Sequence, residues 1–188
     1  MNLEELRQDC AIKQKSGLHF ILASVVIWSA MVWIHLADLP IMTKNLLTFC
    51  CTAPLMPLAF FISKAIKVDF QNKGNPLTNL GILFSVNQIL YLLIAMWVYP
   101  TVPEKMLMVI AMIFGAHLLP YGWLYRSKAY MAFSVAIPIL ALKVGSSSEA
   151  WVLAVMMAGI EIAFSVCLVI ENRGKTGKSV PKAPHHRA

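Results

Sequence analysis

Six long apolar runs, separated by short polar turns, constrain this chain more than any other feature. The hydrocarbon layer of a bilayer is crossed by roughly 20 helical residues, because a helix satisfies its own backbone hydrogen bonds there. The fifth run is the shortest, since Lys143 interrupts it near its end. We therefore expect an all-α polytopic membrane bundle of six transmembrane helices: Leu18–Leu36, Asn45–Ile62, Leu77–Tyr99, Met106–Tyr125, Ala129–Val144 and Glu149–Ile170.

The composition predicts a membrane protein, and we expect no separate soluble catalytic domain. Of 188 residues, 59% are hydrophobic and 13% are charged, whereas soluble domains average about 45–50% apolar and about 25% charged residues. The formal net charge is +7. In a soluble domain that charge would suggest nucleic acid. Here the basic residues adjoin apolar runs, so we expect no nucleic-acid partner and predict contact with anionic lipid headgroups.

The distribution of Lys and Arg predicts how the spans are oriented. Cytoplasmic segments of membrane proteins carry an excess of these residues. If the N-terminus is cytoplasmic, only Lys44, Lys105 and Lys143 lie in outer segments. We therefore expect both termini in the cytoplasm, with the other basic residues in inner segments: Arg7, Lys13, Lys15, Lys64, Lys67, Lys73, Arg126, Lys128, Arg173, Lys175, Lys178, Lys182 and Arg187.

The sequence divides into three predicted segments. Residues 1–17 form a cytoplasmic or interfacial segment, in which Asn2 and Glu5 have the spacing of a helix capping box. A short interfacial helix and a solvated arm both fit this segment. Residues 18–171 form the six-helix transmembrane domain. Residues 172–188 form a basic cytoplasmic tail, which we expect to be disordered because it is polar and broken by prolines.

Glu161 is the only carboxylate deep inside any of the apolar runs. An ionisable side chain at that depth costs about 2.5–3.5 kcal/mol on insertion scales, so it normally faces protein or water. Ala154, Ala158 and Ser165 lie on the same helical face, and small residues let neighbouring helices approach closely. We therefore expect the Glu161 carboxyl to point into the bundle.

Three other polar residues are predicted at a similar depth: His117 in the fourth span, and Asn87 and Gln88 in the third. Polar side chains in hydrocarbon must find partners, so a shared cluster is expected. We predict that Glu161, His117, Asn87 and Gln88 form a site that binds a substrate or a proton. The alternative is that the same groups bond to one another only to lock helix packing, and the sequence leaves both interpretations open.

The residues do not predict enzymatic chemistry, and we expect no catalytic residue, metal or cofactor. A catalytic zinc needs three protein ligands, and His117 with Glu161 provides too few. A bis-histidine haem needs a second histidine at the depth of His117, and His19 and His35 lie at opposite ends of the first span. A lipid-modifying membrane enzyme is therefore the third and last of the functions we consider.

Three segments resemble an uncharacterised family of small bacterial multi-span membrane proteins, a domain of unknown function: LHFILASVVIW, KNLLTFCCTAPLMPLAFFISKAIKVDFQNKGNPL and EKMLMVIAMIFGAHLLPYGWLY. The resemblance runs from about Leu3 to Val144. It implies a multi-pass protein of the bacterial cytoplasmic membrane. It implies no activity, so no residue receives a role from it.

The first functional hypothesis is therefore a small transport-type protein that binds a small molecule or an ion near the middle of the membrane, with Glu161 as its charged or proton-carrying group. The second is a non-catalytic membrane subunit or structural protein, which would contact a protein partner or form a homo-oligomer. The sequence identifies neither a substrate nor an oligomeric state.

Overall fold

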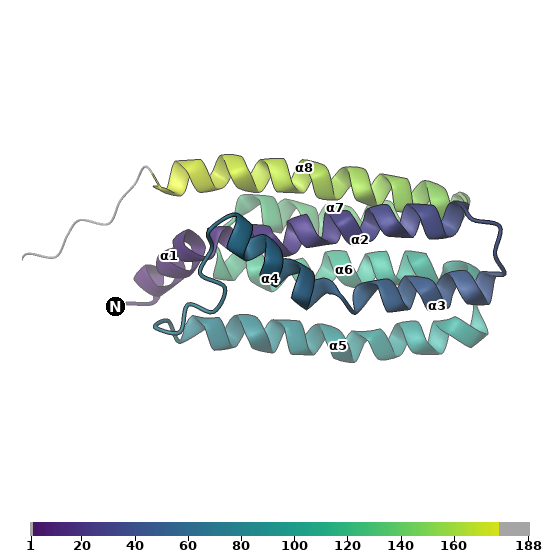
Figure 1. Cartoon of the computed structure of the whole chain (residues 1–188), viewed down its shortest axis with the longest axis horizontal. Helices are drawn as coiled ribbons and strands as arrows, with labels where there is room; N and C mark the ends of the chain where they lie inside the picture. The colour runs from purple at the N-terminus through teal and green to yellow at the C-terminus, as the bar shows by residue number, and fades with distance from the viewer. Residues whose placement is uncertain (1, 177–188) are drawn as a thin grey trace, which may run out of the picture.

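The computed structural model describes residues 2–176, and the secondary structure of this part of the chain is entirely helical (Figure 1). Two short 3-10 segments, Lys15–Gly17 and Pro103–Lys105, join longer helices. The α-helices are α1 (Leu3–Lys13), α2 (Leu18–Leu36), α3 (Ile41–Thr52), α4 (Leu55–Ala65), α5 (Leu77–Thr101), α6 (Met106–Leu124), α7 (Lys128–Ser147) and α8 (Ala150–Thr176).

The predicted helical membrane bundle is confirmed, with five to six candidate spans. Helices α2, α5, α6, α7 and α8 are each long and apolar enough to cross a membrane, and α3 with α4, bent by 43° at a short break, qualifies as one broken span or as a re-entrant loop. The bend falls at Ala53 and Pro54. Proline has no N–H, and its ring clashes with the carbonyl four residues back, so a straight helix cannot pass through it. Ala53 accordingly bonds to the Cys50 carbonyl, only three residues back, at 3.2 Å.

Helix α7 extends beyond the predicted Ala129–Val144 at both ends. Ser127 begins it as an N-cap, because its hydroxyl accepts a hydrogen bond from the Tyr130 N–H at 3.3 Å. Lys143 does not shorten the helix, since its side chain is exposed near the final turn.

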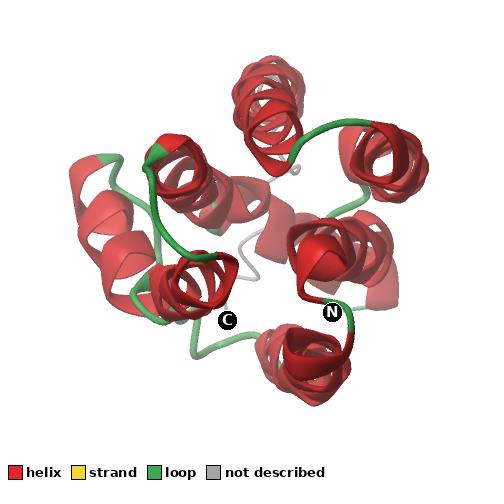
Figure 2. Ribbon diagram, turned by 90° about the vertical axis from the view of Figure 1, so that its right-hand side faces the viewer, coloured by secondary structure: helices red, strands yellow, loops and turns green. Residues whose placement is uncertain are grey.

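The helices run side by side along the long axis of the molecule, as the end-on view shows (Figure 2). The main core joins α2, α6, α7 and α8, and it contains Trp28, Met157 and Phe164. Glycines let α6 and α7 pack closely: a Cβ on Gly115 would lie 2.6 Å from the Ile137 side chain. Helix α5 is peripheral, since only 11% of its most apolar stretch is buried, against 50% in α2.

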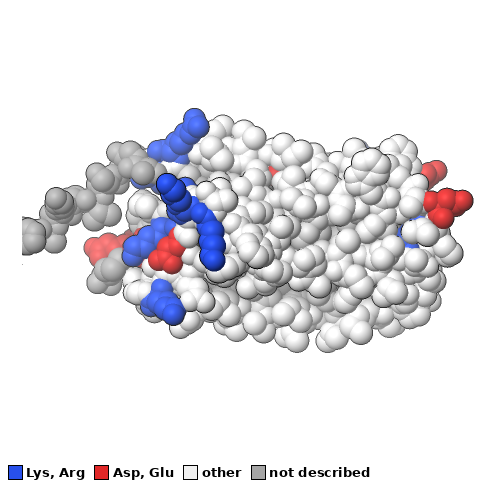
Figure 3. Space-filling model, viewed as in Figure 1, with Lys and Arg blue, Asp and Glu red and all other residues white. Residues whose placement is uncertain are grey.

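Most of the charged side chains lie at the two ends of the bundle (Figure 3). We call one end the basic end; it comprises α1, the α4–α5 loop, the α6–α7 loop and the last turns of α8. The opposite end holds Lys44, Lys105 and Lys143. The orientation of these ends in a cell membrane stays a prediction from the positive-inside rule. The described basic residues at the basic end are Arg7, Lys13, Lys15, Lys64, Lys67, Lys73, Arg126, Lys128, Arg173 and Lys175.

Helix α1 is docked against the basic end. It begins with the predicted capping box: the Glu5 N–H donates to Asn2 Oδ1 at 2.9 Å, and the Asn2 N–H donates to Glu5 Oε2 at 3.0 Å. Cys10 and Ala11 are fully buried. The Arg7 guanidinium donates from Nε to the Trp123 carbonyl at 3.0 Å. These contacts fit a packed helix and not a free arm.

Helix α8 continues to Thr176, past residue 172, where the disordered tail was predicted to begin. Contacts with the N-terminal segment stabilise these extra turns. The Asn172 side chain donates to the Lys15 carbonyl at 2.8 Å, and Lys175 Nζ donates to Ser16 Oγ at 3.0 Å. The rest of the predicted tail, residues 177–188, lies outside the described residues.

Candidate functional site

Glu161 lies near the middle of α8, and its side chain is fully buried. It points toward α2, where its Oε2 atom is hydrogen-bonded to the hydroxyl of Ser24. Ser24 is also buried, at 4% exposure. The carboxyl thus lies in the contact between α2 and α8. The expectation that Glu161 points into the bundle is correct in this structure.

Ser24 has one hydroxyl proton and two oxygen neighbours, which makes its bond to Glu161 sensitive to protonation. Its Oγ atom lies 2.8 Å from the Ile21 carbonyl and also bonds to Glu161 Oε2. If Ser24 donates to Ile21, Glu161 must be the protonated donor to Ser24. If Glu161 is ionised, Ser24 must turn its proton toward the carboxylate. The same heavy-atom arrangement therefore fits two proton positions.

The site also has hydrogen-bonding capacity that residues 2–176 do not satisfy. Glu161 Oε1 is buried without a hydrogen-bond partner in this part of the chain, and so is the hydroxyl of Ser165, one turn further along α8. A buried polar atom without a partner costs about 1–3 kcal/mol. Such groups are uncommon in native proteins, and each needs an explanation such as a functional role.

The walls of the site are apolar and aromatic. Phe164, one turn from Glu161 on α8, is fully buried. The Tyr130 ring from α7 packs edge-on against the Phe164 ring, with ring centroids 4.8 Å apart. Among the described residues, no Lys, Arg or His forms an ion pair with Glu161. A charge on Glu161 would therefore have only the Ser24 hydroxyl to stabilise it directly.

His117 lies in α6 and bonds to its own helix. Its Nδ1 atom is hydrogen-bonded to the Phe114 carbonyl. The proline in this helix, Pro120, leaves the carbonyl of Ala116 without its usual donor, so His117 does not cap the carbonyl that Pro120 frees. The imidazole packs edge-on against Tyr121, with ring centroids 5.9 Å apart.

Asn87 and Gln88 lie on the peripheral helix α5. Asn87 is exposed, and its side-chain amide donates to the Tyr91 hydroxyl at 2.9 Å, one turn away on the same helix. Gln88 is half-buried. Within residues 2–176, no hydrogen bond joins any two of the four residues of the predicted site. The structure instead joins Glu161 to Ser24.

Sequence reasoning missed Ser24, although a signal for it was present. Ser24 lies on one face of α2 with Ile27, Trp28 and Met31, and these residues recur at the three- and four-residue spacing of a buried helical stripe. A hydroxyl on such a stripe must face another helix. Within the described residues, no group of three or more His, Cys, Asp or Glu side chains is arranged to hold a metal ion.

The comparison with protein families finds a match that covers nearly the whole chain. A family described as "Family of unknown function (DUF7010)" matches residues 3–171, nearly the whole chain. No curated protein and no solved structure matches the chain. The predicted resemblance to an uncharacterised family is confirmed. The chain belongs to this family of unknown function.

Proposed function

We propose that this membrane protein is a small proton-responsive transport protein, in which Glu161 takes up and releases a proton between α2 and α8. The observation that supports this most directly is the fully buried Glu161 carboxyl, whose neighbour Ser24 can either donate to it or accept from it. An ionisable side chain at that depth is costly to maintain, and in membrane proteins such residues commonly lie on proton or ion pathways.

Protonation would act on helix packing. With the carboxyl neutral, the α2–α8 contact contains a complete chain of hydrogen bonds from Glu161 through Ser24 to the Ile21 carbonyl. With the carboxyl ionised, the contact holds an uncompensated charge in apolar surroundings. Ionisation of the carboxyl would therefore favour a second arrangement of α2 and α8, one that admits water or a cationic ligand to the carboxylate.

The decisive test uses the proton itself as the probe, because the transported substrate is unidentified. Purified full-length protein is reconstituted into liposomes on a solid-supported membrane, and the pH outside is changed rapidly. We expect a transient current from proton binding in the wild type and its loss in Glu161→Gln. Gln88→Leu is the control, since Gln88 lies on α5 without a hydrogen bond to Glu161. If a correctly folded Glu161→Gln variant gave the same current as the wild type, the proposal would be refuted.

The second candidate is a non-catalytic membrane subunit, and α5 is the observation that favours it. Most of this helix is exposed, yet it carries the polar pair Asn87 and Tyr91 among apolar side chains. Polar groups on an exposed helical face often bond across a helix–helix contact in a membrane. A carboxamide both donates and accepts, so Asn87 is suited to pair with Asn87 of a second copy.

Fluorescence energy transfer between labelled copies in liposomes tests this pairing. The transfer should fall in Asn87→Leu. It should persist in Asn79→Leu, which changes the same residue type near the start of α5.

A further inference from the structure

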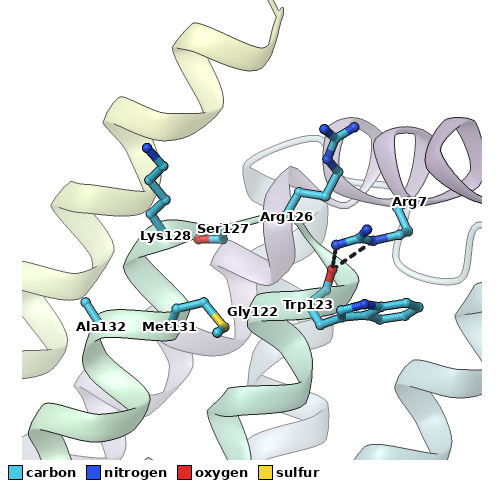
Figure 4. Close-up of a pocket in the computed structure, with 8 residues that line it drawn as sticks. All are labelled: Arg7, Gly122, Trp123, Arg126, Ser127, Lys128, Met131 and Ala132. Atoms are coloured by element: carbon cyan, nitrogen blue, oxygen red, sulfur yellow. Dashed lines mark hydrogen bonds between the residues drawn. The ribbon is translucent and has the colours of Figure 1, made fainter.

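A surface hollow lies at the basic end, where α1 crosses the turn between α6 and α7 (Figure 4). Its volume is about 600 Å³. A second hollow of about 590 Å³ adjoins it and shares Arg126 and Lys128 with it. We call the first one the headgroup hollow. Its lining residues are Arg7, Gly122, Trp123, Arg126, Ser127, Lys128, Met131 and Ala132.

The lining of the headgroup hollow is amphiphilic along the direction of the helices. Figure 4 shows Arg7, Arg126 and Lys128 on the side nearest the α6–α7 turn. Met131 and Ala132 follow Lys128 by three and four residues, so they lie one helical turn deeper along α7. The cations thus lie at the end of the spans, and the apolar side chains lie on the part of α7 that enters the apolar bundle.

The cations differ in how free they are to bind a ligand. Lys128 is exposed, and its side chain forms no hydrogen bond or ion pair with any residue from 2 to 176. Arg126 pairs with the exposed Glu4 at 3.0 Å, an interaction that water weakens. Arg7 is held firmly, because it pairs with Glu4 at 2.7 Å, stacks over the Trp123 ring at 4.4 Å and donates to the Trp123 carbonyl. Arg7 therefore provides a fixed positive wall, and Arg126 and Lys128 provide the mobile donors.

Positive charge exceeds negative charge around the two hollows. Arg7, Arg126, Lys128 and Lys175 face two carboxylates, Glu4 and Glu171. Glu171 is already engaged, since it accepts from the Ser127 hydroxyl at 2.5 Å and from the Ala129 N–H at 2.8 Å. The surplus favours an anionic ligand over a cation or a neutral group.

An apolar track continues from the headgroup hollow along α7. Met131, Val135 and Ile139 follow one another at four-residue spacing, with exposed fractions of 47%, 56% and 61%. In a bilayer this stripe faces acyl chains and not water. A free phosphate ion would use only the cations, whereas a lipid would use both the cations and the stripe.

We propose that the headgroup hollow binds the phosphate of one anionic glycerophospholipid through Arg126 and Lys128, with an acyl chain lying along Met131 and Val135. The lipid belongs to the leaflet at the basic end. Its phosphate competes with Glu4 for Arg126 and draws α1 onto the membrane surface through Arg7. This site is independent of the proton chemistry of Glu161, because it lies at the end of the spans and shares no residue with that site.

The experiment measures lipid binding to the full-length protein by native mass spectrometry from detergent micelles. The probes are phosphatidylglycerol and phosphatidylcholine with identical dioleoyl chains. We expect the wild type to retain phosphatidylglycerol preferentially. One interfacial cation contributes about a fivefold gain in affinity, so Arg126→Gln/Lys128→Gln should weaken phosphatidylglycerol binding by at least tenfold and leave phosphatidylcholine binding unchanged.

A matched control removes the same charge elsewhere at the basic end. Lys64→Gln/Lys73→Gln changes two exposed lysines outside the hollow, and we expect its phosphatidylglycerol binding to stay within twofold of the wild type. An equal loss in this control would overturn the specific site in favour of general surface charge. Inorganic phosphate at the same concentration as the lipid should displace none of it. Complete displacement would overturn the lipid assignment, because it would show that the cations alone define the ligand.

Discussion

The hydroxyl of Ser24 and the carboxyl of Glu161 are hydrogen-bonded between α2 and α8, although 137 positions separate them in the chain. Within residues 2–176, Ser24 is the one hydrogen-bonding partner of the Glu161 side chain, because the other carboxyl oxygen has no partner. Stability and the proposed proton binding at this site would therefore depend on the same pair of side chains.

Ser24→Ala should destabilise the protein. The alanine leaves the Glu161 carboxyl buried with no hydrogen bond from the rest of residues 2–176, and an unsatisfied buried polar group costs about 1–3 kcal/mol. We expect the free energy of unfolding to fall by about that amount when it is measured by denaturing detergent titration in mixed micelles. Ser29→Ala is the control, because among residues 2–176 the Ser29 hydroxyl bonds only to the Val25 carbonyl of its own helix. Equal losses in the two variants would contradict a special role for Ser24.

The double variant Ser24→Ala/Glu161→Leu should recover most of that loss. Replacing both partners of a buried polar pair by apolar groups is often close to neutral, and Phe164 and Trp28 already provide apolar surroundings. We expect its free energy of unfolding to lie within about 1 kcal/mol of the wild type, with no pH-induced current. A variant that is stable but retains the current would show that the proton binds elsewhere.

Gly17→Ala should be strongly destabilising. Gly17 has φ of +71°, and a Cβ there would lie 2.9 Å from the Tyr130 hydroxyl and 3.0 Å from the Tyr125 ring. The left-handed backbone alone costs a non-glycine residue about 1–2 kcal/mol. Thermal unfolding should therefore occur at a clearly lower temperature than in the wild type. The matched variant is Gly74→Ala, where a Cβ meets no atom within 4 Å, and there the transition should barely move.

Docking of α1 should weaken in acid because of Asp9, which lies outside the spans. Its carboxyl accepts from Asn72 at 3.0 Å and from Asn75 at 2.9 Å. Burial alone would raise the pKa of Asp9, but hydrogen bonds from Asn72, Lys13 and Asn75 outweigh burial and hold that pKa below its ordinary value of 3.8. Because the folded pKa is lowered, the stabilisation is complete above pH 3.8 and is lost as the pH falls through the folded pKa.

Hydrogen exchange of the α1 amides, corrected for the intrinsic dependence of exchange on pH, measures this effect. Protection in the wild type should be constant from neutral pH down to about 3.8 and then decline. In Asp9→Asn the protection should be lower at neutral pH and should change little with acid. A steep decline in this variant, equal to that of the wild type, would assign the acid sensitivity to other groups. Glu104→Gln, at the opposite end of the bundle, should behave as the wild type.

Span boundaries were largely predictable because hydropathy and the positions of turn-forming proline and glycine are local properties of the sequence. The bounds of α2 match the prediction at both ends, and α5 and α6 begin where the apolar runs begin. The break between α3 and α4 was missed, although Pro54 was visible in the sequence, because a proline in a membrane helix produces either a mild kink or a full break according to its neighbours. The extra turns of α8 were missed because they depend on the distant Ser16.

The candidate site was less predictable because depth in a span does not determine which helix a side chain faces. Small residues around Glu161 indicated an inward orientation, and the structure agrees. Asn87 has a comparable depth, but it lies on the exposed face of α5 and so does not reach the core. The choice of α2 as the neighbour of α8 is a long-range packing property, and it decides that Ser24 bonds to Glu161.

The pairing of α2 with α8 sets the order in which the protein can mature. Helix α2 is synthesised before α8, so the Ser24 hydroxyl has no Glu161 partner until α8 has been made. Glu161 joins the bundle with α8, and Ser24, its hydrogen-bonding partner within residues 2–176, has already been synthesised by then. Asn172 and Lys175 then bond α8 to Lys15 and Ser16, so the N-terminal segment gains these contacts only after α8 has formed.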